Sequence, residues 1–244
     1  MPPRKSPDLI RGVRGAGRTT IRLMRPTDDP ARLSALHELA DGEPLEPDNA
    51  FLAPPTGQFV AHFHRTGAAG LWAALNEPGR NIEDSVLGVS CLLVAETRDG
   101  EIVGLALAIT PGEVTDVLNR GEPEQDHLTH LVYTVTHIAA LAVDPAHRGQ
   151  GIGASLMKQM RELYTAGGFA IMYGEVRNER AGAFYASRGF ELFGPDDGIR
   201  LGAVVGDAWF TFYPPQGGRY FARSLRPDYT EPLRHLNLRP TPST

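Results

Sequence analysis

The sequence predicts a single α/β domain in which helices flank a mixed central β-sheet. Segments with the period-two pattern of strands alternate along the chain with segments of helical period. An Asp-Gly pair joins two apolar runs, which is a strong hairpin signal. A glycine-rich turn follows a long apolar run, at the kind of junction where α/β folds bind ligands. The 244 residues, 41% of them hydrophobic and 22% charged, suit an ordinary globular protein with a sizeable core.

In the first half of the chain, strand and helix patterns are separated by a proline-rich segment. Asp28 or Asp29 can cap a helix whose first turn holds Pro30. Asp99-Gly100 provides the turn of the hairpin. In chain order, the expected elements are a strand at residues 19–24, a helix with Leu33, Leu36 and Leu39 on one face, a loop at 41–56, a weaker helix at 59–75, and strands at 85–96 and 101–110.

In the second half, an apolar run rich in Val, Thr and Tyr predicts a central strand at residues 131–143. The acidic segment before it, residues 111–130, is expected to be a long loop or a short helix. The later elements are expected to be a helix at 151–166, a strand at 169–176, a helix at 180–187, a strand at 190–193, a loop at 195–207 and a strand at 208–213.

One domain, residues 19–213, accounts for all of these elements. Residues 1–18 are expected to form a disordered basic arm, since prolines and glycines accompany the charges. Residues 214–244 are expected to form a Pro/Arg-rich C-terminal extension.

Composition argues against several classes of protein. The net charge of −5 disfavours nucleic acid as the main partner, although residues 1–25 hold seven Arg or Lys against one acid. A single cysteine, Cys91, excludes an internal disulfide and a Cys-based zinc site; its apolar surroundings predict a buried thiol, and no metal is expected. No apolar run reaches the roughly 20 residues of a membrane-spanning helix, and no signal-peptide core is apparent. A cytoplasmic location is therefore expected.

The glycine-rich turn has the chemistry of an anion site. Asp144-Pro145 ends the preceding strand, since proline lacks the donor that a ladder needs. Glycines at alternate positions then permit a tight turn and keep side chains away from the backbone amides; they are Gly149, Gly151 and Gly153. At the start of a helix these amides and the helix dipole favour an anion, and a diphosphate is the natural ligand. Arg148 could add charge and Ser155 a hydroxyl donor.

The spacing of the residues in this turn bears on three other interpretations. Taken alone, it is equally compatible with a glycine-rich connector that binds nothing. A dinucleotide-binding turn is disfavoured, because the spacing is not G-x-G-x-x-G and no clear βαβ unit with an acid near the end of the next strand follows. A P-loop is excluded, because no Gly-Lys-Ser/Thr follows.

Two segments together resemble the signatures of one family, the GNAT superfamily of N-acetyltransferases. The first is similar to its coenzyme A signature, Gln/Arg-x-x-Gly-x-Gly/Ala, and runs from Val143-Asp144-Pro145 to Arg148-Gly149-Gln150-Gly151-Ile152-Gly153. The resemblance implies that backbone amides from Arg148 to Ala154 hold the pyrophosphate of acetyl-CoA, the co-substrate. It also implies that Leu141 and Val143 pair through their main chains with the pantetheine arm. The amide of Leu141 or its neighbour would polarise the acetyl carbonyl.

The second segment resembles the family's pattern N-x-x-A-x-x-F-Y-x-x-x-G-F and runs Asn178-Glu179-Arg180-Ala181-Gly182-Ala183-Phe184-Tyr185-Ala186-Ser187-Arg188-Gly189-Phe190. The resemblance implies that Asn178 contacts coenzyme A or caps the helix. It implies that the Tyr185 hydroxyl protonates the leaving thiolate, whereas the residue pattern alone also fits a half-buried aromatic on an amphipathic helix.

An attacking amine must lose a proton, and two residues are candidates for the base. His137 lies in the predicted central strand, where some family members place a glutamate, and its ordinary pKa suits the task. Strict alternation would place it on the same side as Ala139 and Leu141, although a bulge would break this parity. Glu175 stands in a Glu-Val-Arg that resembles the one in N-terminal-amine acetylases of the family, although the loop before the asparagine is two residues shorter. Each is equally compatible with a structural polar group, and several family members use no dedicated base.

The expected activity is transfer of an acetyl group from acetyl-CoA to a primary amine, by direct attack in a ternary complex. The acceptor, a small-molecule or peptide amine, would be selected by residues 41–80, 111–130 and 195–213. A non-catalytic acyl-CoA sensor and a nucleic-acid-associated protein with a degenerate acetylase fold are the alternatives. No membrane partner is expected, and a homodimer is compatible with the sequence.

Overall fold

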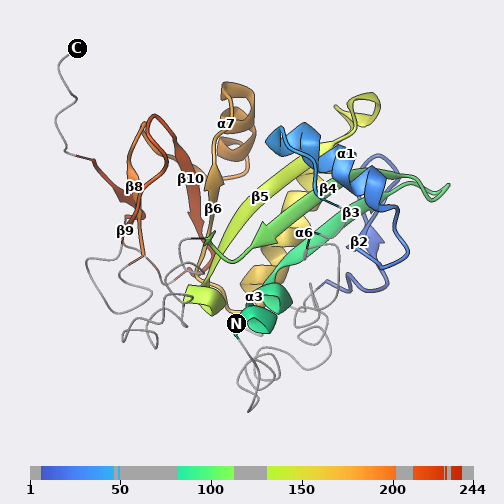
Figure 1. The fold of residues 1–244 in the computed structure, drawn as a ribbon, viewed down its shortest axis with the longest axis horizontal. Coiled ribbons are helices and arrows are strands. Elements are labelled where there is room, and N and C mark those ends of the chain that lie inside the picture. The colour runs from blue at the N-terminus through green and yellow to red at the C-terminus, as the bar shows by residue number, and fades with distance from the viewer. Residues whose placement is uncertain are drawn as a thin grey trace.

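An eight-stranded mixed sheet forms the centre of the computed structural model (Figure 1), which describes residues 7–46, 49, 82–112, 131–201, 211–227, 229 and 232–237. Its strands, in spatial order, are β1 (Val13–Arg14), β2 (Thr20–Leu23), β3 (Cys91–Glu96), β4 (Ile102–Ile109), β5 (Val135–Val143), β6 (Ile171–Glu175), β10 (Tyr220–Ser224) and β7 (Glu191–Leu192). Neighbouring strands are antiparallel, except that β5 and β6 are parallel. A second sheet of three strands contains β11 (Arg234–His235), β8 (Gly198–Arg200) and β9 (Thr211–Phe212).

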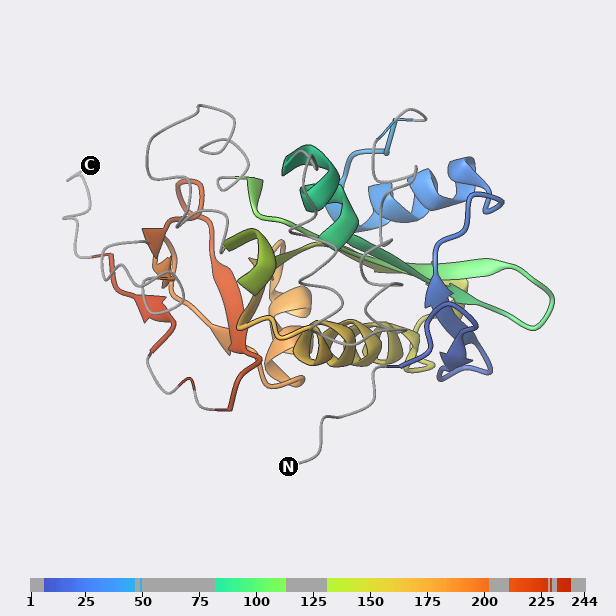
Figure 2. The same cartoon turned by 90° about the horizontal axis from the view of Figure 1, so that it is seen from below.

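Helices cover both faces of the main sheet, as the edge-on view in Figure 2 shows. Helix α1 (Pro30–Asp41) lies on one face, where Leu33 and Leu36 pack against buried residues of β3 and β4. Helix α6 (Ile152–Ala166) lies on the opposite face and buries Leu156 and Met160 in the larger core cluster. Further helical elements are α3 (Ile82–Val89), the 3₁₀ turn η2 (Pro145–His147) and α7 (Glu179–Ala186).

The two parallel strands pair along only part of their length. Residues Val135–Ile138 of β5 face Ile171–Gly174 of β6, and the pairing stops there. From there to Val143, β5 pairs with β4 but no longer with β6. A β-bulge at Ala139 marks the separation, because Ile138 and Ala140 pair with consecutive residues of β4. The separation leaves one backbone edge of β5 open within the sheet.

Most predicted elements are confirmed, including the mixed α/β class. Asp29 is the cap of α1, because its carboxylate accepts a hydrogen bond of 3.0 Å from the Ala31 amide. Leu33 and Leu36 are buried as predicted, whereas Leu39 is 49% exposed. The hairpin at Asp99-Gly100, the helix α6, the strand β6 and the helix α7 all lie at the predicted positions.

Three predicted boundaries are wrong. Residues 85–89 belong to α3 rather than to a strand, and residues 131–134 are helical before β5 begins. The predicted loop at 195–207 contains β8. In the first two cases a short apolar run fits a helix turn and a strand equally well by periodicity, so tertiary packing decides.

The two ends of the chain contribute more to the fold than their composition suggests. Residues 7–18 are not a disordered arm: β1 pairs with β2, and Leu9 is buried in the larger core cluster. The C-terminal extension supplies β10, which lies between β6 and β7 with Tyr220 and Phe221 buried. Strand β10 has few apolar residues and lies among prolines and arginines, so the composition of this segment did not predict a strand.

Several predictions fall outside the described residues. These are the helix at 59–75, most of the loop at 41–56, nearly all of the segment at 111–130, and the first part of the strand at 208–213. Within the part of the chain that the structure describes, no helix combines the length and the apolar character needed to span a bilayer.

Candidate functional site

A cleft of about 390 Å³ opens where β5 and β6 separate. It is bounded by the end of α1, the open edge of β5, the end of β6, the start of α7 and the turn before α6. The predicted site residues that line it are His137, Leu141, Val143, Arg148, Gly153, Glu175, Asn178 and Tyr185. The fold therefore brings the three candidate catalytic side chains and the start of the predicted cofactor turn into one cavity.

The turn before α6 presents backbone amides. Asp144 begins it by accepting a hydrogen bond of 2.9 Å from the Ala146 amide. Gly149 and Gly151 have φ of 78° and 79°, in the left-handed region where only glycine is unstrained. Gly151 is also the cap of α6, and among the described residues no side-chain cap satisfies the first N–H groups of this helix. Such a helix start, with its dipole, favours an anion.

Arg148 and Ser155, whose side chains could assist an anion, make hydrogen bonds within the chain. Arg148 folds back across the turn, and its Nε donates a hydrogen bond of 3.0 Å to the Val143 carbonyl. The Ser155 hydroxyl accepts a hydrogen bond of 2.9 Å from the Ala16 amide, so it anchors the β1–β2 turn to α6. The Ile152 side chain is buried in the core, and only its backbone could face a ligand. Of the other predicted cofactor residues, Gly149, Gln150 and Gly151 belong to the turn and Ala154 to the first turn of α6, and none of them lines the cleft.

The orientation of backbone groups at the open edge follows from one hydrogen bond. The Asp144 amide donates to the Val103 carbonyl of β4 at 2.9 Å. Because the backbone groups of successive strand residues point to opposite sides, the N–H and C=O of Val143 and of Leu141 point away from β4. They therefore lie at the edge that faces the cleft, where an extended ligand could pair with them.

Tyr185 is held by aromatic neighbours at the inner end of the cleft. Its ring stacks on Phe221 of β10, with centroids 3.6 Å apart and 14° between planes, and meets Phe184 and Phe190 edge-on. Only 7% of the residue is exposed, and this burial raises the pKa of its hydroxyl above the ordinary value. Among the described residues, none forms a hydrogen bond with that hydroxyl. Asn178 caps α7, the helix that carries Tyr185: its side-chain oxygen accepts a hydrogen bond of 2.9 Å from the Ala181 amide.

The bulge at Ala139 changes the side to which His137 points. His137 pairs with Ile109, which packs in the cluster on the α1 face, whereas Leu141 pairs with Ala106, which packs on the α6 face. The prediction that His137 and Leu141 share a side is therefore wrong. The extra residue shifts the alternation by one, which a period-two pattern cannot reveal.

The two candidate bases lie in different electrostatic surroundings. The His137 ring stacks on Tyr173, with centroids 5.0 Å apart. Burial lowers its pKa to about 4, with the Arg177 cation adding to the shift and Asp41 opposing it. The imidazole is therefore neutral at neutral pH. Glu175 is half-buried at the end of β6, opposite Tyr220, where β5 and β6 no longer pair.

An ion pair that the sequence did not suggest lies beside these candidates. Arg177, one of the residues lining the cleft, donates to the carboxylate of Asp41, the last residue of α1. Leu39 and Ala40 also line the cleft, so the end of α1 forms one wall. The partners are 136 residues apart in the chain, and neither stands in a recognisable pattern with the other. Only the tertiary structure could identify the pair.

An open strand edge beside a turn of uncapped amides is a site for an extended ligand that carries phosphates. Residues 88–192 match the family model described as an acetyltransferase (GNAT) domain. This range contains the strands on both sides of the cleft, the turn before α6 and the helix that carries Tyr185. This part of the chain thus matches an acetyltransferase (GNAT) domain.

Comparisons with solved structures return other acetyltransferases of low identity. A protein from Salmonella typhimurium, solved with its cofactor acetyl-CoA, is 15% identical over 87% of this chain and 97% of that one, with a TM-score of 0.46. A GNAT family acetyltransferase from Elizabethkingia anophelis, with acetyl-CoA bound, is 14% identical over 85% and 99% of the two chains, with a TM-score of 0.43. The ribosomal-protein-S18-alanine N-acetyltransferase from Escherichia coli is 15% identical over 85% and 94%, with a TM-score of 0.42. A search of curated proteins gives no match.

Proposed function

We propose that this chain is an N-acetyltransferase that moves an acetyl group from acetyl-CoA to a primary amine, by direct attack in a ternary complex. The observation that carries the proposal is the placement of an open β5 edge, the uncapped start of α6 and the buried Tyr185 around one cleft. The acceptor is a small-molecule or peptide amine.

The cofactor would lie along the open edge of β5. Amides from Arg148 to Ala154 would hold the diphosphate at the start of α6. The pantetheine arm would pair with the outward-facing backbone of Leu141, and with the amide of Val143, since the Val143 carbonyl already accepts from Arg148. A Leu141 amide that points into the cleft would also donate to the acetyl oxygen as negative charge develops there.

In the reaction, the amine nitrogen attacks the acetyl carbonyl, the carbon–sulfur bond breaks and the thiolate of coenzyme A leaves. Tyr185 would give that thiolate its proton, because burial keeps the hydroxyl protonated and no described residue engages it. The amine must first lose a proton. Glu175 or the neutral His137 would take it, directly or through water; burial lowers the pKa of His137 and so weakens it as a base.

An acceptor screen tests the proposal. The full chain is incubated with acetyl-CoA and a panel of polyamines, aminoglycosides and peptides with free amino termini, and released thiol is followed with a dye. We expect thiol release that depends on one class of amine and an acetylated product of matching mass. Calorimetric binding of acetyl-CoA without thiol release from any amine would instead support a non-catalytic acyl-CoA sensor.

A further inference from the structure

Arg32 connects three segments that are distant in the sequence. It lies in the first turn of α1, and its Nε donates a hydrogen bond of 2.7 Å to the Ile102 carbonyl at the start of β4. Its Nη2 forms an ion pair of 2.7 Å with Asp144 and a longer contact of 3.5 Å with Glu101. One guanidinium thus ties α1 both to the β3–β4 hairpin and to the residue after β5.

Asp144 is the residue at which the cofactor turn begins. Its amide makes the 2.9 Å bond to Val103 that continues the β4–β5 pairing. Its two carboxylate oxygens have separate partners: Oδ1 accepts from Ala146 and starts η2, and Oδ2 accepts from Arg32. The hydrogen bond from Arg32 is the main cause that lowers the pKa of Asp144, so the carboxylate is charged at neutral pH. The direction in which the turn leaves the sheet therefore depends on this carboxylate.

The far end of the same helix is also fixed by an ion pair. Asp41 ends α1 and pairs with Arg177, which follows β6, while Leu39 and Ala40 line the cleft between the two pairs. Helix α1 is thus attached at its first turn to the segment that leads into Arg148, and at its last residue to the segment that leads into Asn178. A shift of the cofactor turn would be transmitted to the wall of the cleft.

We propose that Arg32 is a positioning residue for the cofactor: through Asp144 it fixes the turn whose amides hold the diphosphate, and it couples that turn to α1. The inference rests on the proposed function. Neither signature segment contains Arg32, which lies 112 residues from Asp144 in the chain. The side chains of the pair are only 28% and 19% exposed, so solvent and salt screen it less than a surface pair.

Binding of acetyl-CoA to the full chain, measured by calorimetry, tests the proposal without need of an acceptor. Arg32→Gln removes the charge, and Asp144→Asn keeps an oxygen for the Ala146 amide while weakening the ion pair. We expect each variant to raise the Kd of acetyl-CoA roughly tenfold, and the double variant to raise it no further than the worse single variant. Arg32→Lys retains charge but cannot donate to Ile102 and Asp144 together, so its affinity should fall between those of Arg32→Gln and the wild type.

Arg11→Gln is the matched control, because Arg11 is an exposed arginine whose pair with Asp8, 3.9 Å long, lies away from the cleft. It should leave the Kd unchanged. Hydrogen exchange adds a local measurement: in Arg32→Gln the amides of residues 146–151 should exchange faster without ligand, while those of β4 keep their wild-type rates.

Two results would overturn the proposal. One is a Kd for Arg32→Gln and Arg32→Lys equal to that of the wild type, with only the melting temperature lowered, which would make Arg32 a purely structural residue. The other is a double variant whose Kd rises by the product of the single effects, because the two residues would then act independently. If the wild type itself does not bind acetyl-CoA, the proposed function fails together with this inference.

Discussion

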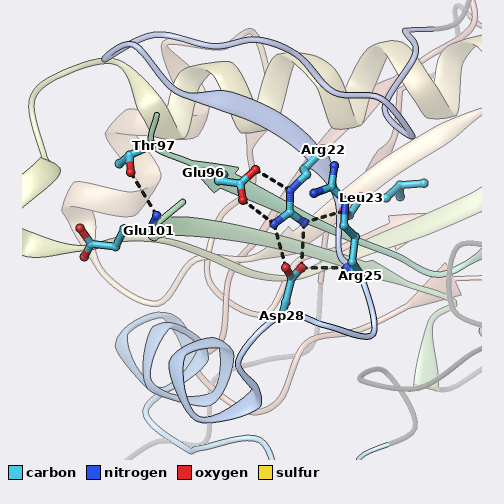
Figure 3. A network of polar contacts seen from close by, with 7 residues as sticks. All are labelled: Arg22, Leu23, Arg25, Asp28, Glu96, Thr97 and Glu101. Atoms are coloured by element: carbon cyan, nitrogen blue, oxygen red, sulfur yellow. Dashed lines mark hydrogen bonds and ion pairs between the residues drawn. The ribbon is translucent and has the colours of Figure 1, made fainter. Parts of the chain in front are cut away.

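Arg22 is a charged residue that is almost completely buried, at the junction of β2, β3 and the loop before α1 (Figure 3). Its guanidinium has five N–H donors, and all of them have acceptors. Asp28 and Glu96 each accept two of these bonds, and the Leu23 carbonyl accepts the fifth at 3.1 Å. Asp28 also accepts from the Arg25 amide at 2.8 Å. A buried charge is tolerated here because no donor is left unpaired.

Arg22→Gln should destabilise the fold, since it leaves two shielded carboxylates without their cation. We expect the free energy of unfolding, measured in urea at pH 7, to fall by about 3 kcal/mol. The variant should also respond less to acid. Hydrogen bonds from Arg22 lower the pKa of Glu96 below its ordinary 4.5. Burial raises the pKa of Asp28, but hydrogen bonds from Arg22 and the Arg25 amide, together with the charges of both arginines, lower it below its ordinary value.

The sign of the acid effect follows from these directions. Both carboxylates have lower pKa values when folded than when unfolded, so their stabilisation is complete above pH 4.5 and is lost as the pH falls through the folded values. The stability of the wild type should therefore decline more steeply below that pH than the stability of Arg22→Gln. Parallel declines for the two proteins would show that other groups dominate acid unfolding.

Tyr185 illustrates a residue whose environment suits an acid better than a base. Tyr185→Phe keeps the stack on Phe221 and removes only the hydroxyl, which no described residue engages. We expect kcat to fall about 100-fold or more, with the Kd of acetyl-CoA changed less than about twofold. Phe184→Leu, one position earlier on α7, is the comparison for a general loss of aromatic packing. Wild-type kcat in Tyr185→Phe would exclude the hydroxyl as the proton donor.

At the scale of elements, the turn before α6 explains which positions of its signature must be glycine. Gly151 has a left-handed φ of 79°, and an added Cβ would lie 3.2 Å from the Ala16 Cβ. At Gly153 the φ is not left-handed, and an added Cβ would lie 3.5 Å from Val143, an ordinary contact. The signature that the sequence resembles allows alanine at the position of Gly153 but not at that of Gly151, and the backbone gives the reason.

Alanine substitutions separate these two positions. Gly151→Ala costs about 1–2 kcal/mol of backbone strain and should change the direction of the backbone N–H groups at the start of α6. The Kd of acetyl-CoA should therefore rise roughly tenfold. Gly153→Ala should alter the Kd far less and leave the melting temperature unchanged. Calorimetry on the two variants gives the comparison. An equal loss of affinity in both variants would mean that glycine is needed at these positions because a side chain would collide with the ligand, and not because of the backbone φ.

At the scale of the whole molecule, local patterns predicted the elements but not their long-range contacts. The glycine turn, the cap at Asp29 and the α7 signature are local, so spacing alone places them. The bulge at Ala139 depends on how β5 fits β4, and the pairs of Arg32 and Asp41 join segments more than 100 residues apart. Neither kind of feature leaves a periodic trace in the sequence.

The same limitation concealed the role of the C-terminal segment, and truncation tests it. A chain ending at residue 213 lacks β10, which pairs with both β6 and β7 and supplies Phe221, the residue on which Tyr185 stacks. It also lacks β11, which pairs with β8. The loss would expose the backbone edge of β6 and the core residues around Tyr185, so we expect no cooperative thermal transition and no acetyl-CoA binding.

A chain ending at residue 237 keeps every described strand and serves as the control; it should melt and bind acetyl-CoA like the full chain. Circular dichroism follows folding, and calorimetry follows binding. A 1–213 chain that melts cooperatively and binds acetyl-CoA with wild-type affinity would contradict this prediction, and would restore the domain boundary at residue 213 that composition suggested. The expected result instead makes the Pro/Arg-rich extension part of the same folded domain, because Phe221, on which Tyr185 stacks, follows the predicted end of that domain.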